Sequence, residues 1–358
     1  MFEKVVVPSK FANAKIRNLY SKASSAPGPT GGEIGIEFEL EGVGVQTHLQ
    51  SKFGMNPEIT NWSYHNDGSL DDTGGEYVFT KPVTRSVAKK QVSDFYEYID
   101  QNKTKITLNL SPRCSTHIHL NFANFTVSQT VLFLVMYYSY EDALIKAVAP
   151  ERVGNRFCLS LSDSHGIGEY LIDDLKIGSF QKATSHYRKY SACNIAALAK
   201  FGTLEFRAMG GCADANLLNK WLDALLDLYD FAKLNPKLTP DFFMSSLSSS
   251  SFEAYTASNF PAVFNLIKNL PDLSQYLDKG VWNAQNIAYA VDWSEVVKYN
   301  TEKKERATNK TYPTGATPSK TLSTTVKPYG LSPPKKKSML ATMYGTSPTP
   351  IPFSSWDD

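Results

Sequence analysis

Three short segments of the chain each carry two polar side chains separated by one apolar residue. They read Glu37-Phe38-Glu39, His117-Ile118-His119 and Glu205-Phe206-Arg207. Successive side chains of a β-strand point to opposite faces of a sheet, so both polar members of each pair would share one face. Each segment therefore predicts a strand with one polar face and one apolar face.

The three pairs differ in the chemistry that they offer. Two carboxylates about 6 to 7 Å apart repel each other unless water or a cation lies between them, and oxygen ligands suit hard ions such as Mg²⁺. Imidazoles bind metals or hydrogen-bond to phosphates, and an arginine beside a carboxylate can stabilise the oxygens of a transferring phosphoryl group. The alternatives are a solvated acidic strand face, exposed histidines and a surface ion pair.

Apolar residues alternate with these pairs and define the opposite face of the predicted sheet. They are Ile34, Ile36, Phe38 and Leu40 in the first segment, Ile118, Leu120 and Phe122 in the second, and Leu204 and Phe206 in the third. If the three strands share one sheet, its polar face would form a concave metal and phosphate site, and its apolar face would pack on helices.

The same reasoning extends to the elements that must position the pairs. Alternation predicts strands at 33–42, 62–66, 75–80, 105–110, 115–122 and 203–209. Helical periodicity predicts helices at 86–102, 128–148, 214–234 and 282–299, the third of them capped by Asp214. Strands do not alternate regularly with helices, which favours an α+β fold with a largely antiparallel sheet over a doubly wound parallel one.

Composition limits the domain organisation and the classes of partner. The 358 residues are 42% hydrophobic and 20% charged, which is typical of a globular chain with a buried core. Residues 1–300 hold 28 Lys and Arg against 31 Asp and Glu, a net charge of −3 that gives no electrostatic footprint for nucleic acid. Residues 301–358 carry +5 and eight of the nineteen prolines, which predicts a disordered tail rich in Pro, Ser, Thr and Lys.

The location that these features predict is cytoplasmic. The longest apolar stretch, 131–138, is far shorter than a bilayer crossing requires, and the first residues lack the pattern of a secretory signal. The four cysteines are widely spaced with no Cys-x-x-Cys pair, so neither a disulfide framework nor a zinc ribbon is expected. We expect no membrane partner.

The order of the motifs along the chain resembles that of a known family. It runs Gly35-Ile-Glu37-Phe-Glu39, His65-Asn-Asp67-Gly-Ser69, Gly75-Glu76, His117-Ile-His119, Asn194 and Glu205-Phe-Arg207. Over residues 33–232 this series is similar to the amidoligase family of phages, bacteria and fungi, a distant branch of the glutamine synthetase-like carboxylate–amine ligases. The resemblance implies a sheet of the glutamine synthetase catalytic-domain type with helices on one face. The catalytic domain would span 1–300, including a helical extension at 233–300.

The resemblance also implies an activity and roles for the motif residues. The chain would be an ATP-dependent ligase that forms an amide bond through an acyl phosphate, with two or more Mg²⁺ or Mn²⁺ ions. The implied metal ligands are Glu37, Glu39, Glu76, His117 and Glu205. The implied cofactor-binding residues are His119, Arg207, Ser69 and Asn194. Arg207 and Arg188 would contact the γ-phosphoryl group of ATP, and Asp67 would act as the base for the amine, with Ser69 on the same acceptor side.

The resemblance also implies the substrates of the chain, and two other functions remain as alternatives. The substrates would be a small-molecule or peptide carboxylate and an amine, in the host cytoplasm if the chain is encoded by a phage, and an oligomer is possible. Neither a Gly-x-x-x-x-Gly-Lys-Ser/Thr loop nor a dinucleotide fingerprint occurs, so ATP would bind on the sheet. The alternatives are a metal-dependent hydrolase that uses the same Glu and His residues, and a non-enzymatic interaction protein that docks through its tail.

Overall fold

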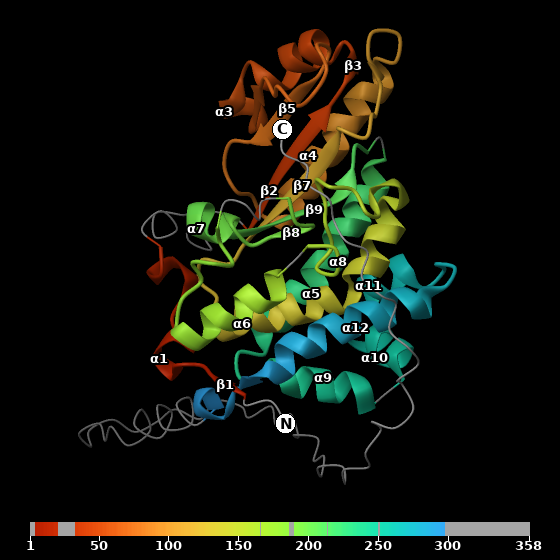
Figure 1. Ribbon diagram of the computed structural model, residues 1–358. Helices are drawn as coiled ribbons and strands as arrows, with labels where there is room; N and C mark the ends of the chain where they lie inside the picture. Colours follow the sequence, from red (N-terminus) through yellow and green to blue (C-terminus); the bar gives the residue numbers. More distant parts are fainter. Residues whose placement is uncertain are drawn as a thin grey trace, which may run out of the picture. The chain divides into compact units, whose positions relative to one another are not determined.

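The fold is built around one antiparallel sheet, as a computed structural model of the chain shows (Figure 1). The structure describes residues 4–20, 33–164, 166–185, 190–212, 214–249 and 251–297, all within one unit that spans Met1–Lys310. The described residues confirm the expected α+β class. The tail predicted to be disordered, 301–358, lies outside them.

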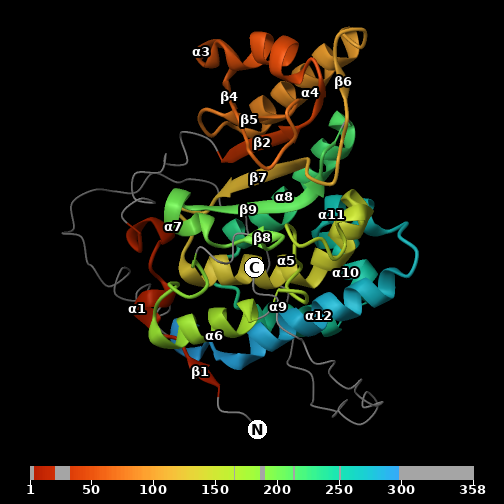
Figure 2. The same cartoon turned by 45° about the horizontal axis from the view of Figure 1, so that its top comes forward.

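Six strands form the central sheet in the order β4-β5-β2-β7-β9-β8, and every neighbouring pair is antiparallel (Figure 2). They are β4 (Trp62–His65), β5 (Gly75–Phe79), β2 (Ile34–Leu40), β7 (Ser115–Asn121), β9 (Thr203–Gly210) and β8 (Cys193–Asn194). The predicted strands at 33–42, 62–66, 75–80, 115–122 and 203–209 are thereby confirmed to within two residues, whereas β8 is an addition.

The prediction of a strand at 105–110 is wrong for most of that segment. Within it the strand β6 (Thr107–Leu108) has two residues, and it pairs with β3 (Gly42–Val43) outside the central sheet. The backbone N–H groups of Lys105 and Ile106 turn back to the carbonyl of Asn102 at the end of the preceding helix. These two residues therefore close a helix instead of opening a strand.

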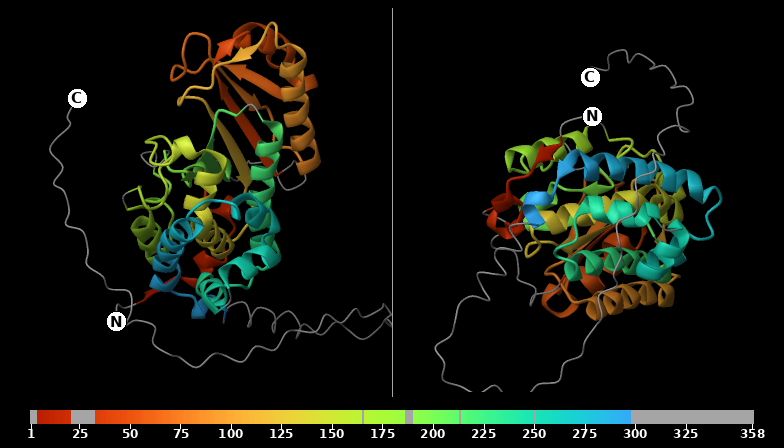
Figure 3. Two further views of the ribbon diagram at one scale, coloured as in Figure 1. Left: turned by 90° about the vertical axis from the view of Figure 1, so that its right-hand side faces the viewer. Right: turned by 90° about the horizontal axis from the view of Figure 1, so that it is seen from below.

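Three helices cover the apolar face of the sheet (Figure 3). They are α4 (Arg85–Gln101), α5 (Val127–Val148) and α8 (Ala215–Leu234), and they confirm three of the predicted helices. Aromatic rings join the two layers, because Phe95 of α4 lies 5.0 Å from Phe38 of β2 and Phe133 of α5 lies 5.7 Å from Phe206 of β9. These centroid distances are typical of attractive aromatic pairs in a core.

The bounds predicted for the fourth helix, 282–299, are wrong. Helix α12 spans Leu273–Ala290, and the chain continues as β10 (Val291–Asp292), which pairs in parallel with β1 (Val5–Val6). The helix ends at Ala290 because the backbone of the next two residues is taken up by this pairing. Residues 294–297, within the predicted range, are helical again, and its last residues, 298–299, lie outside the described residues.

A second layer of helices covers the outer side of α5 (Figure 1). It contains α6 (Ile167–Ile177), α9 (Pro240–Ser249), α10 (Phe252–Asn259), α11 (Pro261–Ile267) and α12. Nearly every side chain of α5 is buried because the helix lies between this layer and the sheet.

Short elements complete the described fold. They are α1 (Ser9–Ala12), the 3₁₀ helix η1 (Ile16–Asn18), the π-helical segment η3 (Val45–Gly54), α3 (Pro57–Thr60), the 3₁₀ helix η4 (Pro150–Arg152) and α7 (Ala197–Phe201). None of the helices in the described ranges has both the length and the apolar character that a bilayer crossing needs.

Candidate active site

The central strand β2 carries two carboxylates on the polar face of the sheet. In the antiparallel pairing, Glu37 lies opposite His117 of β7, and Glu39 lies between Ser115 of β7 and Glu76 of β5. The intervening apolar residues of β2 are fully buried on the other face. Register alone therefore brings four of the predicted metal ligands to neighbouring positions, two on β2 and one on each adjacent strand.

The polar residues of the next two strands continue this arrangement. His119 of β7 pairs with Glu205 of β9, and Glu205 pairs with Asn194 of β8. On the β2 side, His119 faces Gly35, where an added Cβ would lie 3.3 Å from the Cβ of the histidine. The absence of a side chain at Gly35 gives the imidazole ring of His119 its space.

One group of potential ligands, here called the histidine cluster, consists of Glu37, His119 and Glu205. One ligand atom of each lies within 4.8 Å of the other two. The Nδ1 atom of His119 contacts the hydroxyl of Thr203 at 3.0 Å, which orients the ring. Its buried Nε2 atom lies 3.1 Å from Oε1 of Glu37 but makes no hydrogen bond with the described residues. A buried imidazole nitrogen beside a carboxylate, with a second carboxylate within reach of the same ion, fits a metal site.

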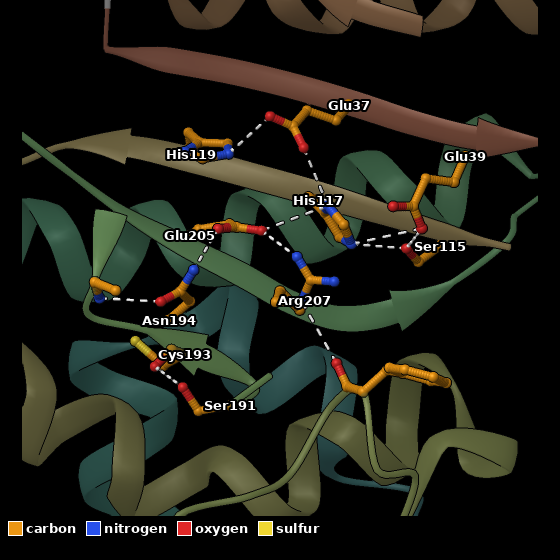
Figure 4. A network of polar contacts seen from close by, with 12 residues as sticks. Glu37, Glu39, Ser115, His117, His119, Ser191, Cys193, Asn194, Glu205 and Arg207 are labelled. Carbon is orange, nitrogen blue, oxygen red and sulfur yellow. Dashed lines mark hydrogen bonds and ion pairs between the residues drawn. The ribbon is translucent and has the colours of Figure 1, made fainter. Parts of the chain in front are cut away.

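His117 lies against the same carboxylates from the other side (Figure 4). Its Nδ1 atom is 3.1 Å from Oε2 of Glu37 and 3.5 Å from Oε1 of Glu205. The sequence predicts His117 as a metal ligand and His119 as a nucleotide contact, whereas the structure brings both rings to Glu37. Both assignments stay predictions, and His119 is a candidate ligand as well.

A second group, here called the carboxylate cluster, consists of Glu39, Asp67 and Glu76. Its ligand oxygens also lie within 4.8 Å of one another. Burial raises the pKa of Glu76 to about 7, and the negative charges of Glu37, Glu39 and Asp67 add to this effect. A cation at this cluster would offset the repulsion. Asp67, predicted as a base, thus lies beside two predicted metal ligands.

In the histidine cluster the pKa values of the two carboxylates are lowered, in contrast to that of Glu76. Burial alone would raise the pKa of Glu37, but the two histidines outweigh it and hold that pKa well below its usual value. Burial likewise opposes ionisation of Glu205, yet His119, His117 and Arg207 lower its pKa. The pKa of His119 is raised because Glu37 outweighs the effect of burial. The two carboxylates are therefore held in their ionised form.

Arg207 and Asn194 both hold Glu205. Nη1 of Arg207 lies 2.5 Å from Oε1 of Glu205, and the Nδ2 atom of Asn194 donates to Oε2 at 2.6 Å. The Oδ1 atom of Asn194 accepts from the backbone N–H of Ala196. Asn194, which the resemblance assigns to cofactor binding, therefore already uses both ends of its amide within the protein. Arg207 keeps a second contact with the carbonyl of Phe157 at 3.4 Å.

The other two predicted residues lie at the edge of this arrangement or beyond it. Ser69 is exposed on the turn after β4, and its backbone N–H donates to the carboxylate of Asp67 at 2.8 Å. This bond orients Asp67 toward its place beside Glu39. Arg188 lies outside the described residues.

A cavity of about 430 Å³ opens beside the histidine cluster. Glu37 and His119 line it together with Lys81, Lys200 and Phe201. The ring of Phe201 meets that of His119 edge to face at 5.9 Å, and Nζ of Lys200 lies 4.5 Å from the centre of the Phe201 ring. The cavity thus joins an aromatic surface and two cationic side chains to the candidate ligands.

The sequence analysis missed several residues that contact the site. Ser115 and Thr203 contact His117 and His119, and each stands two residues before a predicted ligand. The alternation that identified the pairs would have placed both hydroxyls on the same polar face. Lys81, Lys200 and Phe201 carry no comparable signal, because they lie outside the strands.

Comparison with known proteins supports the resemblance found in the motifs. No curated protein matches the chain. The model of a family described as "putative amidoligase enzyme" matches residues 81–228. This segment includes His117, His119, Asn194, Glu205 and Arg207 and ends before Leu234, whereas the carboxylates of β2 precede it. Over residues 81–228 the chain is thus similar to this amidoligase family.

Proposed function

We propose that the chain is an ATP-dependent carboxylate–amine ligase that works through an acyl phosphate. The observation that carries this proposal is the pair of clusters side by side on β2, with Glu37 in one and Glu39 in the other. Phosphoryl transfer depends on divalent cations and a guanidinium around the transferring oxygens. The family match supports a ligase, and the two clusters with Arg207 support the phosphoryl-transfer route.

The donor atoms fit two hard divalent cations such as Mg²⁺ or Mn²⁺. The carboxylate cluster offers only oxygens, and the histidine cluster offers two carboxylates and the buried Nε2 of His119. Cations bound there would neutralise the charge between the phosphate oxygens of ATP and an incoming carboxylate. Arg207 would stabilise the same oxygens from the side of β9.

The cavity beside the histidine cluster is where we propose that the nucleotide binds. Lys81 and Lys200 would balance phosphate charge, and the face of Phe201 could carry a flat ring. Because Glu37 and His119 line the cavity, a nucleotide there would direct its phosphates to the clusters. The carboxylate and amine substrates would then approach from the side of Asp67.

In the proposed reaction, an oxygen of the substrate carboxylate attacks the γ-phosphorus of ATP and ADP leaves. The amine nitrogen next attacks the acyl carbon, and inorganic phosphate leaves as the amide forms. An amine must lose a proton in this step, and we propose Asp67 as the acceptor. Asp67 lies in the segment between β4 and β5, outside the strands, and one of its carboxylate oxygens is within 4.8 Å of those of Glu39 and Glu76.

The test is release of ADP that depends on a carboxylate. Purified protein with Mg²⁺ and ATP is offered a panel of amino acids and short peptides, with hydroxylamine as a general amine. We expect turnover with one class of carboxylate, and a loss of at least about 100-fold in Glu37→Gln and Arg207→Ala, because each removes charge stabilisation in the transition state. Lys103→Ala, at an exposed position, is the matched control.

The outcomes separate the candidate functions. Turnover of an ester, amide or phosphate without ATP would replace the ligase by a metal-dependent hydrolase. ATP binding without any carboxylate-dependent release of ADP across the panel would contradict the proposed activity.

A further inference from the structure

A serine hydroxyl lies between the two clusters. Oγ of Ser115 donates a hydrogen bond to Oε2 of Glu39, and it lies 2.7 Å from Nε2 of His117 (Figure 4). Both partners are buried, as is the serine itself. Ser115 thus contacts a member of the carboxylate cluster directly and reaches the histidine cluster through His117.

The direction of the hydrogen bond between Ser115 and Glu39 follows from the donor count. A hydroxyl has one proton, and an ionised carboxylate only accepts, so the proton of Ser115 is used by Glu39. Nε2 of His117 faces the same hydroxyl at 2.7 Å and Nδ1 faces Oε2 of Glu37 at 3.1 Å, and the tautomer of the ring sets which of the two nitrogens donates. The contacts Glu39–Ser115–His117–Glu37 therefore run without interruption from one cluster to the other.

The hydroxyl also restricts the side chain of Glu39. With Oε2 bound to Ser115, Oε1 is the oxygen of Glu39 that is left to bind a cation together with Asp67 and Glu76. A glutamate has three side-chain torsions, and a fixed partner removes the freedom that ion binding would otherwise have to restrict. His117 reaches the same oxygen of Glu39 only at 3.8 Å and cannot replace the hydroxyl.

We propose that Ser115 is a positioning residue that presents Glu39 to the cation of the carboxylate cluster. This inference rests on the proposed function in one respect, namely that the clusters hold cations. It predicts an effect confined to one of the two sites. His119 and Glu205 of the histidine cluster have their own supports in Thr203, Asn194 and Arg207. Glu37 contacts Nδ1 of His117, the ring nitrogen that does not face Ser115.

Mn²⁺ alone is a suitable probe, because its unpaired electrons report the atoms that bind it. Mn²⁺ in the histidine cluster should show nitrogen coupling in pulsed electron paramagnetic resonance, and Mn²⁺ in the carboxylate cluster should not. Titration calorimetry gives the affinity of each site. In Ser115→Ala we expect the site without nitrogen coupling to weaken about 10- to 100-fold, while the nitrogen-coupled site keeps its affinity.

The matched control is the next residue on the strand. Thr116 points to the core, and its buried hydroxyl has no partner among the described residues, so Thr116→Val should leave both affinities unchanged. Thermal unfolding of both variants checks that the fold is kept.

Equal weakening at both sites, or unchanged affinities in Ser115→Ala, would overturn the positioning role. If the wild-type protein binds no Mn²⁺, the inference and the proposed metal sites both fail. If two Mn²⁺ ions bind as expected but no carboxylate-dependent release of ADP occurs, the ligase proposal fails while the role of Ser115 stands.

Discussion

Glu37 and Glu76 show how the surroundings decide the behaviour of one residue type. The two histidines hold the pKa of Glu37 well below its usual value, whereas Glu76, on the neighbouring strand, has its pKa raised to about 7 by burial and by other carboxylates. Glu37 is thus ionised before any cation arrives. Glu76 gains its full charge readily only when a cation offsets the repulsion around it.

A buried carboxylate away from the site gives a prediction on pH and stability. Glu141 of α5 is fully enclosed, and burial raises its pKa well above the usual value; Oε2 accepts from the N–H of Leu161 at 2.6 Å, and Oε1 has no partner among the described residues. Above the ordinary pKa the unfolded chain releases this proton while the folded chain keeps it. Stability therefore falls as the pH rises through that window.

Glu141→Gln keeps an acceptor for Leu161 and cannot ionise. We expect the variant and the wild-type protein to have similar stabilities near pH 4, and the variant to become progressively the more stable of the two toward pH 8. Urea unfolding at a series of pH values measures the difference. The exposed Glu58→Gln serves as the control, and a difference that does not change with pH for Glu141→Gln would contradict the prediction.

At the scale of single strands, alternation was sufficient to predict which side chains share a face. It identified both carboxylates of β2 and both histidines of β7. Within one strand, alternate side chains point to opposite faces, so the sequence of the strand is enough to assign each residue to a face. The register between strands cannot be predicted in this way, because it depends on pairing with residues far away in the chain. The sequence therefore could not decide which histidine meets which carboxylate.

The irregularity in β9 shows the same limit. Thr116 pairs with Met209, and Ile118 pairs with Phe206. Two residues of β9, Arg207 and Ala208, therefore lie opposite one residue of β7, His117. Such a bulge redirects side chains at the point where it occurs. The alternation in the sequence continues through Arg207, and nothing in it marks the extra residue.

The cap of α8 gives a prediction at the same scale. The carboxylate of Asp214 accepts from the N–H groups of Asn216 at 2.8 Å and Leu217 at 3.3 Å, as the sequence predicted for this position. Asp214→Ala should lower the free energy of unfolding by about 1 kcal/mol, while Asp214→Asn, which keeps an acceptor, should cost less. Urea unfolding compares the variants, and equal losses in the two would show that the cap is not the cause.

At the scale of the whole described fold, the segment that matches the family depends on helices outside it. Helix α5 lies within residues 81–228, and α12 packs along it from outside that segment. Gly280 of α12 permits the close approach, because an added Cβ would lie 2.7 Å from the backbone oxygens of Ser139 and Tyr138. The helical extension expected at 233–300 thus takes part in enclosing the core.

Gly280→Val should consequently push α12 away from α5. We expect a loss of about 1–3 kcal/mol in the free energy of unfolding, the usual cost of overfilling a packed interior. Gly68→Ala is the comparison, since an added Cβ at Gly68 meets no atom within 4 Å. Chemical denaturation of both variants measures the effect, and an equally stable Gly280→Val protein would show that the two helices can separate freely.

The two-residue spacing on β2 has a consequence for how this protein can vary. Inserting or deleting one residue between Ile34 and Glu37 would turn Glu37 and Glu39 into the apolar layer and bring Phe38 and Leu40 out to water. Ionised groups in that layer would be very costly, so the chain would lose its native structure together with its ligands. We therefore expect folded variants of this protein to carry substitutions in β2 but no insertions or deletions.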